Sequence, residues 1–134
     1  MLDLGQVYSE VFSFTQEQVI RFAEVSGDHN PVHLDADYAS KTAFKKPIIH
    51  GILGISIFSK ILGMNFPGEG TIYLKQDVNF KRPMYVGTSY EAILTVLEVN
   101  KDKHLAVIET KVIDKETGKV IIDGQAQVLN KEKI

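Results

Sequence analysis

The sequence predicts an α+β protein in which one apolar helix covers a curved antiparallel sheet. The segment 48–63 is the most apolar of the chain, and its apolar residues would occupy nearly every side of a helix. After it come four runs with strand-like patterns, separated by turn-like segments. An apolar helix and a half-apolar sheet are stable when they pack in layers around one core.

The N-terminal part is predicted to begin with a strand over residues 8–14 and to continue with a helix. Thr15 and Gln18 have the spacing of a capping box, in which each side chain accepts a hydrogen bond from the other residue's backbone. The helix is therefore expected from Thr15 to about Val25.

The next segment is predicted to be a loop, because Gly27-Asp28 and Asn30-Pro31 favour turns and a residue before proline is biased away from helix. Asp28 and His33 would both project from it. A short helical turn is expected over residues 35–40.

The segment 48–63 is predicted to form a buried central helix. Gly51 and Gly54 lie inside it, although glycine costs about 1 kcal/mol relative to alanine in a helix interior. We therefore expect a strand or a ligand to approach the helix closely at these positions.

The four strand-like runs cover residues 71–80, 90–99, 105–113 and 120–129. In the first, apolar and polar residues alternate, as expected for a strand with one buried face. The C-terminal half is therefore predicted to be an antiparallel meander.

Length and composition limit the classes of function. The chain has 134 residues, the size of one domain, and its net charge of −2 argues against a nucleic-acid partner or a polybasic membrane anchor. It has no cysteine, which excludes disulfides, thiolate metal sites and a cysteine nucleophile. No apolar stretch approaches the roughly 20 residues of a membrane span, and the start lacks the features of a signal peptide. We expect a cytoplasmic protein with no membrane partner.

Asp28 and His33 are the candidate catalytic residues. A carboxylate and an imidazole that face one small molecule can hold a water and move its proton near neutral pH. The alternative is that Asp28 caps a turn and His33 is a packed or surface side chain.

Four segments, in this order, resemble one family. Residues 26–33 (SGDHNPVH) resemble the signature of the (R)-specific enoyl-CoA hydratases, or MaoC-like dehydratases, of the hotdog superfamily. Residues 44–53 (FKKPIIHGIL), 70–74 (GTIYL) and 78–87 (VNFKRPMYVG) resemble the same family. The resemblance covers nearly the whole chain, and it is strongest to short single-domain members linked to polyhydroxyalkanoate synthesis.

The resemblance implies one MaoC-like hotdog domain over residues 1–134, in which the sheet wraps around the central helix and the active-site loop overhangs it. It implies reversible syn hydration of trans-2-enoyl-CoA to (3R)-3-hydroxyacyl-CoA. Asp28 and His33 would hold the catalytic water, with His33 as the expected base. The backbone N–H of Gly51 would stabilise the thioester oxyanion, at a helix N-terminus that favours negative charge.

The resemblance also implies substrate contacts, at Asn30, His50, Ser59, Leu62, Lys81 and Arg82. Lys81 and Arg82, with Lys45 and Lys46, are candidates for the CoA phosphates, although a solvated basic face is the alternative. Asn30 could instead form an Asx-turn, and Ser59 could bond to its own helix backbone.

No cofactor beyond the substrate's own CoA is expected. No metal is expected either, because the histidines of the loop have no convincing third partner in the sequence. The resemblance implies a homodimer or a dimer of dimers, and the compact chain favours short acyl groups such as crotonyl.

Two other functions remain open at this point. The same fold supports acyl-CoA thioesterases, since a fold does not determine a function. A non-catalytic module that binds acyl-CoA or acyl-carrier protein is the second alternative, although it would not need both Asp28 and His33.

Overall fold

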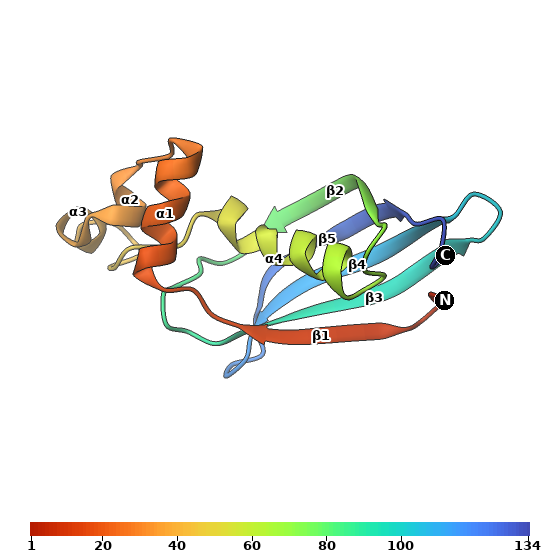
Figure 1. Cartoon of the computed structure of the whole chain (residues 1–134). Coiled ribbons are helices and arrows are strands. Elements are labelled where there is room, and N and C mark those ends of the chain that lie inside the picture. Colours follow the sequence, from red (N-terminus) through yellow and green to blue (C-terminus); the bar gives the residue numbers. More distant parts are fainter.

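A computed structural model describes residues 1–134. Five strands form one antiparallel sheet in the order β1-β3-β4-β5-β2 (Figure 1). They are β1 (Val7–Phe12), β2 (Ile72–Phe80), β3 (Tyr90–Asn100), β4 (Leu105–Asp114) and β5 (Val120–Leu129). The predicted meander is confirmed for β3, β4 and β5, whereas β2 lies beyond β5 at one edge of the sheet.

The helices form two groups. They are α1 (Gln16–Ser26), α2 (Pro31–Leu34), α3 (Ala36–Ser40) and α4 (Gly51–Met64). The first three gather beyond one end of the sheet, whereas α4 lies beside β2 and in front of the sheet (Figure 1). The predicted α+β arrangement of one helix on an antiparallel sheet is confirmed.

Helix α1 begins at the predicted capping box. The Thr15 hydroxyl accepts the N–H of Gln18 at 3.2 Å, and the Gln18 side chain accepts the N–H of Thr15 at 2.9 Å. Gly27 ends the helix with a φ of 80°, a left-handed conformation that glycine adopts without steric cost. The chain can therefore turn sharply just before Asp28.

The segment after Gly27 is only partly the predicted loop. Asp28 does lie in a loop, but His33 lies in the one-turn helix α2. Pro31 is the first residue of that turn, where its missing N–H costs nothing, and the Asn30 side chain accepts the N–H of Val32 at 3.1 Å. The bias before proline therefore acts on Asn30, which is the cap, and does not prevent a helical turn after it.

Helix α4 begins three residues later than predicted. Ile48 forms an isolated bridge with Tyr85, and the N–H of Ile49 donates to the Met84 carbonyl at 2.9 Å. These extended residues continue the chain beside the segment that follows β2. The helix is also buried on one side only, because a single sheet covers it, and Ile52 remains 59% exposed.

The two glycines of α4 lie where the structure approaches the helix closely, as predicted. A Cβ on Gly51 would lie 2.7 Å from the ring of Phe80, at the end of β2. A Cβ on Gly54 would lie 2.7 Å from the Met84 sulfur. The missing side chains let the strand and the helix pack together at the N-terminal turn of α4.

One hydrophobic core of 22 buried residues lies between α4 and the sheet. Phe58, Ile61 and Leu62 contribute from the helix, and Leu94 and Ile108 are fully buried from β3 and β4. No helix in the structure is long and apolar enough to cross a bilayer. The packing of α4 on the sheet places its N-terminal turn, and with it the candidate site, beside Phe80 at the end of β2.

Candidate active site

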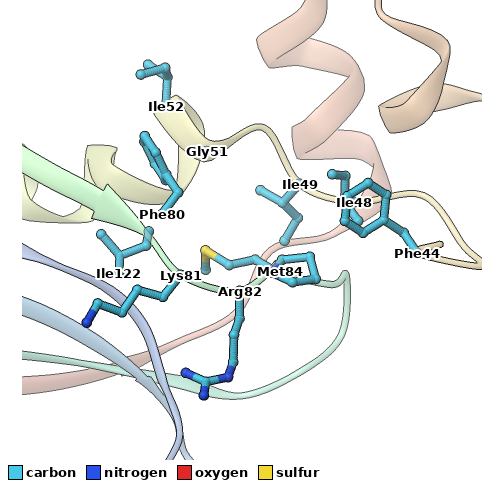
Figure 2. A pocket seen from close by; sticks show the side chains of 11 residues that line it. Phe44, Ile48, Ile49, Gly51, Ile52, Phe80, Lys81, Arg82, Met84 and Ile122 are labelled. Carbon is cyan, nitrogen blue, oxygen red and sulfur yellow. The ribbon is translucent and has the colours of Figure 1, made fainter. Parts of the chain in front are cut away.

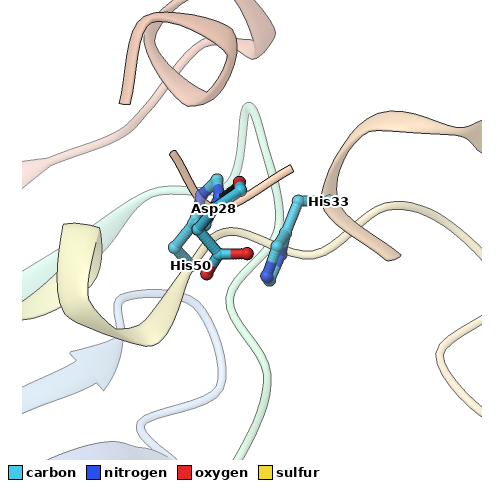
Figure 3. Close-up of side chains that lie close together, drawn as sticks. All are labelled: Asp28, His33 and His50. Carbon is cyan, nitrogen blue, oxygen red and sulfur yellow. Dashed lines mark hydrogen bonds between the residues drawn. The ribbon is translucent and has the colours of Figure 1, made fainter. Parts of the chain in front are cut away.

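Three side chains from separate elements meet at the N-terminal end of α4. Asp28 comes from the loop after α1, His33 from α2, and His50 immediately precedes α4 (Figure 3). One potential ligand atom from each lies within 4.8 Å of those of the other two. The predicted pair is thus brought together, and a second histidine joins it.

The His33 imidazole is fixed in one orientation. Its Nδ1 lies 2.8 Å from the carbonyl oxygen of Ile48, and because a carbonyl can only accept, Nδ1 carries the proton. The Gln16 side chain donates to the His33 carbonyl at 3.1 Å and ties α2 to the start of α1. In the neutral ring, Nε2 therefore has a free lone pair and can accept a proton.

Asp28 is exposed, but its backbone and carboxylate are held by the loop. Its N–H donates to the Ser26 hydroxyl at 3.1 Å, and its Oδ1 accepts the N–H of Asn30 at 3.2 Å. The proposed turn-capping role of Asp28 is therefore present. It occupies one carboxylate oxygen, and the second can still accept a hydrogen bond from a water.

His50 is almost completely buried, with 2% of its surface exposed. Its Nε2 lies 3.0 Å from the carbonyl oxygen of Asp28, the bond drawn in Figure 3, so Nε2 carries the proton. Its ring stacks on His33 with centroids 3.8 Å apart, and Phe22 packs against it edge-on. Its Nδ1 is buried and has no hydrogen-bond partner.

Gly51 is the first residue of α4, and no side chain caps this end of the helix. The first N–H groups of a helix have no partner within it, and together with the helix dipole they favour negative charge. Gly51 also lines a cavity of about 460 Å³, most of whose walls are apolar (Figure 2). The cavity walls include Ile49, Ile52, Phe80, Met84 and Ile122. An apolar group can therefore lie directly beside free N–H donors.

Lys81 and Arg82 lie at the same cavity, but their charged ends point away from its apolar side chains (Figure 2). The Lys81 ammonium lies 3.2 Å from the Asp123 carboxylate, and the Arg82 guanidinium donates to the Val120 carbonyl. Hydrogen bonds from Asn79 and Lys81 hold the pKa of Asp123 below its usual value near 3.8. Both cations thus already have partners within the chain, and their contact with the phosphates of CoA stays a prediction.

The other predicted contact residues do not line the cavity beside Gly51. Asn30 caps α2, as the Asx-turn alternative proposed. Ser59 is exposed in a second groove, which Tyr73 and Gln76 also line, and Leu62 is buried in the core and lines neither cavity. Burial raises the pKa of Tyr73 to about 12. The roles of Asn30, Ser59 and Leu62 toward a substrate stay predictions.

The expectation that the loop histidines lack a third partner is wrong. A third partner does exist, since His50 lies with Asp28 and His33. The two imidazoles are nevertheless stacked, with 28° between their planes. Nitrogen lone pairs lie in the ring plane, so two nearly parallel rings do not direct them to a common ion at about 2.0–2.1 Å. The arrangement is better suited to a water that His33 and Asp28 share.

Comparison with known proteins agrees with the resemblance drawn from the sequence. The family model described as "MaoC like domain" matches residues 5–120, which is most of the chain. The chain belongs to the MaoC-like family. Its fold is therefore the hotdog fold, and the prediction of the family is confirmed.

Relatives of this MaoC-like chain include enzymes with assigned activities. It is 39% identical to the (R)-specific enoyl-CoA hydratase of Aeromonas caviae over 95% of this chain and 94% of that protein. It is 32% identical to the mitochondrial 3-hydroxyacyl-[acyl-carrier-protein] dehydratase of Arabidopsis thaliana over 96% of this chain and 78% of that protein.

A solved structure supports the same family. It is an (R)-hydratase from A. caviae involved in PHA biosynthesis, with a TM-score of 0.92 and 39% sequence identity. The similarity covers 96% of this MaoC-like chain and 97% of that one. The two backbones therefore agree over nearly their whole lengths.

Proposed function

We propose that this protein catalyses the reversible syn hydration of a trans-2-enoyl-CoA to a (3R)-3-hydroxyacyl-CoA. The observation that carries the proposal is that Asp28 and His33 face each other beside the free N-terminus of α4. Two (R)-specific enoyl-CoA hydratases that are 39% and 36% identical to the chain support it.

The geometry gives each group a separate task. Asp28 and the free Nε2 of His33 hold one water between them. His33 takes a proton from that water as the oxygen bonds to Cβ of the enoyl group, and the electron pair of the double bond shifts to the thioester oxygen. A proton from the Asp28–His33 pair then reaches Cα on the same face, which completes a syn addition.

The N–H of Gly51 is proposed to stabilise the thioester oxygen while it carries negative charge. Donors that are already fixed where charge develops need no reorganisation during the reaction, and one such donor contributes about 10²–10³-fold in kcat. The free end of α4 supplies such a donor, and the dipole of the helix has the matching sign.

The apolar cavity of about 460 Å³ beside Gly51 is proposed to hold the acyl chain, and the compact chain favours a short one such as crotonyl. Lys81 and Arg82 at its rim are proposed to contact the CoA phosphates. The reaction needs no cofactor beyond the CoA of the substrate, because water is the only other reactant.

The protein is further proposed to act as a homodimer in which the two sheets lie side by side. Strand β2 is an edge strand with no neighbour on its outer side. Ile72, Leu74 and Phe80 of this strand are each at least half exposed, as is Ile52 on α4. A second copy would cover this apolar surface.

The test follows the loss of enoyl-thioester absorbance with crotonyl-CoA, and it identifies the product with an (R)-specific 3-hydroxyacyl-CoA dehydrogenase. Asp28→Asn and His33→Ala are each expected to lower kcat about 10²–10⁴-fold, since each removes a group that moves or holds the reacting proton. His29→Ala is the matched control, because His29 is exposed in the same loop and lies outside the cluster; it should keep near wild-type activity.

The alternatives give different results in the same experiment. Release of free CoA thiol without hydration would identify a thioesterase, and saturable binding of crotonyl-CoA without any turnover would identify a binding module. A parallel assay with crotonyl-acyl-carrier protein decides between the two carriers. Hydration by wild type that neither substitution reduces would contradict the proposed roles of Asp28 and His33.

A further inference from the structure

His50 has no task in the proposed reaction, although it lies against both catalytic side chains. Only 2% of its surface is exposed. The ring is covered by His33 on one face and by the edge of Phe22. A substrate could reach His50 only by displacing these neighbours, so the substrate contact expected from the sequence does not fit this burial.

His50 instead contacts each part of the proposed catalytic machinery. Its Nε2–H donates to the carbonyl of Asp28 at 3.0 Å and so holds the backbone of the loop that carries the carboxylate. Its ring supports the imidazole of His33 with centroids 3.8 Å apart. Its backbone immediately precedes Gly51, and its carbonyl accepts the N–H of Gly54 at 3.0 Å in the first turn of α4.

His50 joins parts of the site that are far apart in the sequence. Asp28 lies 22 residues before His50, and no other hydrogen bond in the structure links the side chain or backbone of Asp28 to α4 or to the residues just before it. Without the Nε2–H bond, Asp28 would be held by its own turn around Ser26 and Asn30. Its only link to the start of α4 would then run through α2, which bonds to Ile48.

Nδ1 of His50 has no hydrogen-bond partner, so the reason for a histidine at this position lies in Nε2 and in the ring. A buried polar atom with no partner costs free energy, and such atoms are uncommon in folded proteins. An apolar residue of the same shape would avoid that cost at Nδ1, but it would lose the donor at Nε2 and leave the Asp28 carbonyl without its bond. Histidine combines a flat ring for His33 with a donor for Asp28.

We propose that His50 is a positioning residue, which holds the Asp28 loop and the His33 ring in register with the Gly51 N–H. The inference rests on the proposed hydratase function. It assigns His50 no contact with the substrate and no proton transfer. Because the reacting groups must be aligned closely, a displacement of about 1 Å is sufficient to lower kcat about 10²-fold.

Two substitutions separate the two features of the side chain. His50→Gln keeps an N–H donor close to the position of Nε2, whereas His50→Phe keeps a flat ring and removes the donor. His50→Phe is expected to lower kcat of crotonyl-CoA hydration about 10²-fold with KM changed less than about threefold. His50→Gln should recover at least about tenfold of that loss, because it restores the bond to the Asp28 carbonyl. All rates are expressed per folded molecule, measured by thermal unfolding of each variant.

A second measurement does not depend on activity. In ¹H–¹⁵N spectra, His50→Phe should shift the amide signals of residues 28–30 and Gly51, and His50→Gln should leave them closer to wild type. If wild type does not hydrate enoyl-CoA but the spectra behave as described, the proposed function fails and the positioning of the loop by His50 stands.

Three outcomes would overturn the inference. One is a kcat per folded molecule that stays at the wild-type value in His50→Phe. Another is a raised KM with unchanged kcat, which would return His50 to the substrate-contact role. The third is an equal loss in His50→Phe and His50→Gln that follows their loss of thermal stability, which would make His50 a packing residue only.

Discussion

At the scale of single residues, the protonation pattern of the two histidines follows from their carbonyl partners. His33 Nδ1 faces the Ile48 carbonyl and His50 Nε2 faces the Asp28 carbonyl, so each of these nitrogens carries a proton. Nε2 of His33 remains free to accept a hydrogen bond near the exposed side chain of Asp28, whereas Nδ1 of His50 is buried without a partner. Two histidines in direct contact thus have different roles because their backbone partners differ.

The close packing of Gly51 against Phe80 can be tested by substitution. Gly51→Ala should lower kcat about tenfold or more, since the added Cβ would meet the Phe80 ring at 2.7 Å and displace the first turn of α4 together with its N–H groups. Steady-state hydration kinetics measure the effect. Phe80→Leu in the Gly51→Ala background removes the ring atoms that the Cβ would meet, and we expect it to restore part of kcat.

The Phe80→Leu single variant is the control for that pair. Phe80 lines the cavity and belongs to the surface that a second copy is proposed to cover, so the single variant measures what its replacement alone does to kcat, KM and stability. A fully active Gly51→Ala variant would show that the contact with Phe80 does not constrain the first turn of α4.

At the scale of elements, the backbones of β2 and β5 come close together at Gly124. Gly124 in β5 lies opposite Val78, and a Cβ there would lie 1.9 Å from the Asp77 carbonyl oxygen. Asp77 also accepts the N–H of Gln125 through its side chain at 3.1 Å. Since Phe80 at the end of β2 packs against Gly51, the position of this edge strand affects the site.

Gly124→Ala is therefore expected to destabilise the protein by about 3 kcal/mol or more, because backbone atoms cannot move aside as a flexible side chain can. Urea denaturation followed by circular dichroism measures the free energy of unfolding. Gly63→Ala is the matched control: no atom lies within 4 Å of the added Cβ, and alanine in a helix is favoured by up to about 1 kcal/mol. Similar stabilities for the two variants would contradict the close contact at Asp77.

At the scale of the whole molecule, the helices α1 to α3 form a unit beyond the end of the sheet and hold two of the three clustered side chains (Figure 1). The sheet and α4 hold the third side chain and the apolar cavity. The site is therefore assembled where the overhanging unit meets the layered core. The exposed apolar edge at β2 lies next to this junction, since Phe80 contributes to both.

Leu74→Asp tests the proposed dimer. The charge would lie on the exposed edge strand, where Leu74 is 50% exposed, and burying it against a second copy without a partner would be costly. We expect wild type to sediment as a dimer in analytical ultracentrifugation and Leu74→Asp to sediment largely as a monomer. Leu97→Asp is the control, because Leu97 is exposed on β3 away from this edge. A monomeric wild type would contradict the proposed assembly.

The sequence alone determined the kinds of element and predicted Asp28 and His33 as the candidate pair. The alternation of apolar residues, the capping box at Thr15 and the turn-forming residues act over a few positions, so they can be recognised without the fold. The strands β3 to β5, the start of α1 and the close approach at Gly51 and Gly54 were all predicted from such local features. The family resemblance came from short segments of the same kind.

Only the tertiary structure decided how these parts meet. In the fold, His50 lies against His33 and bonds to Asp28, and Lys81 pairs with Asp123. Helix α4 begins at Gly51, after Ile48 and Ile49 have formed extended contacts. These contacts join residues 17 to 42 positions apart, and their geometry depends on the path of the whole chain around the core. Local spacing holds no information about that path, which is why the role of His50 could be inferred only once the fold was known.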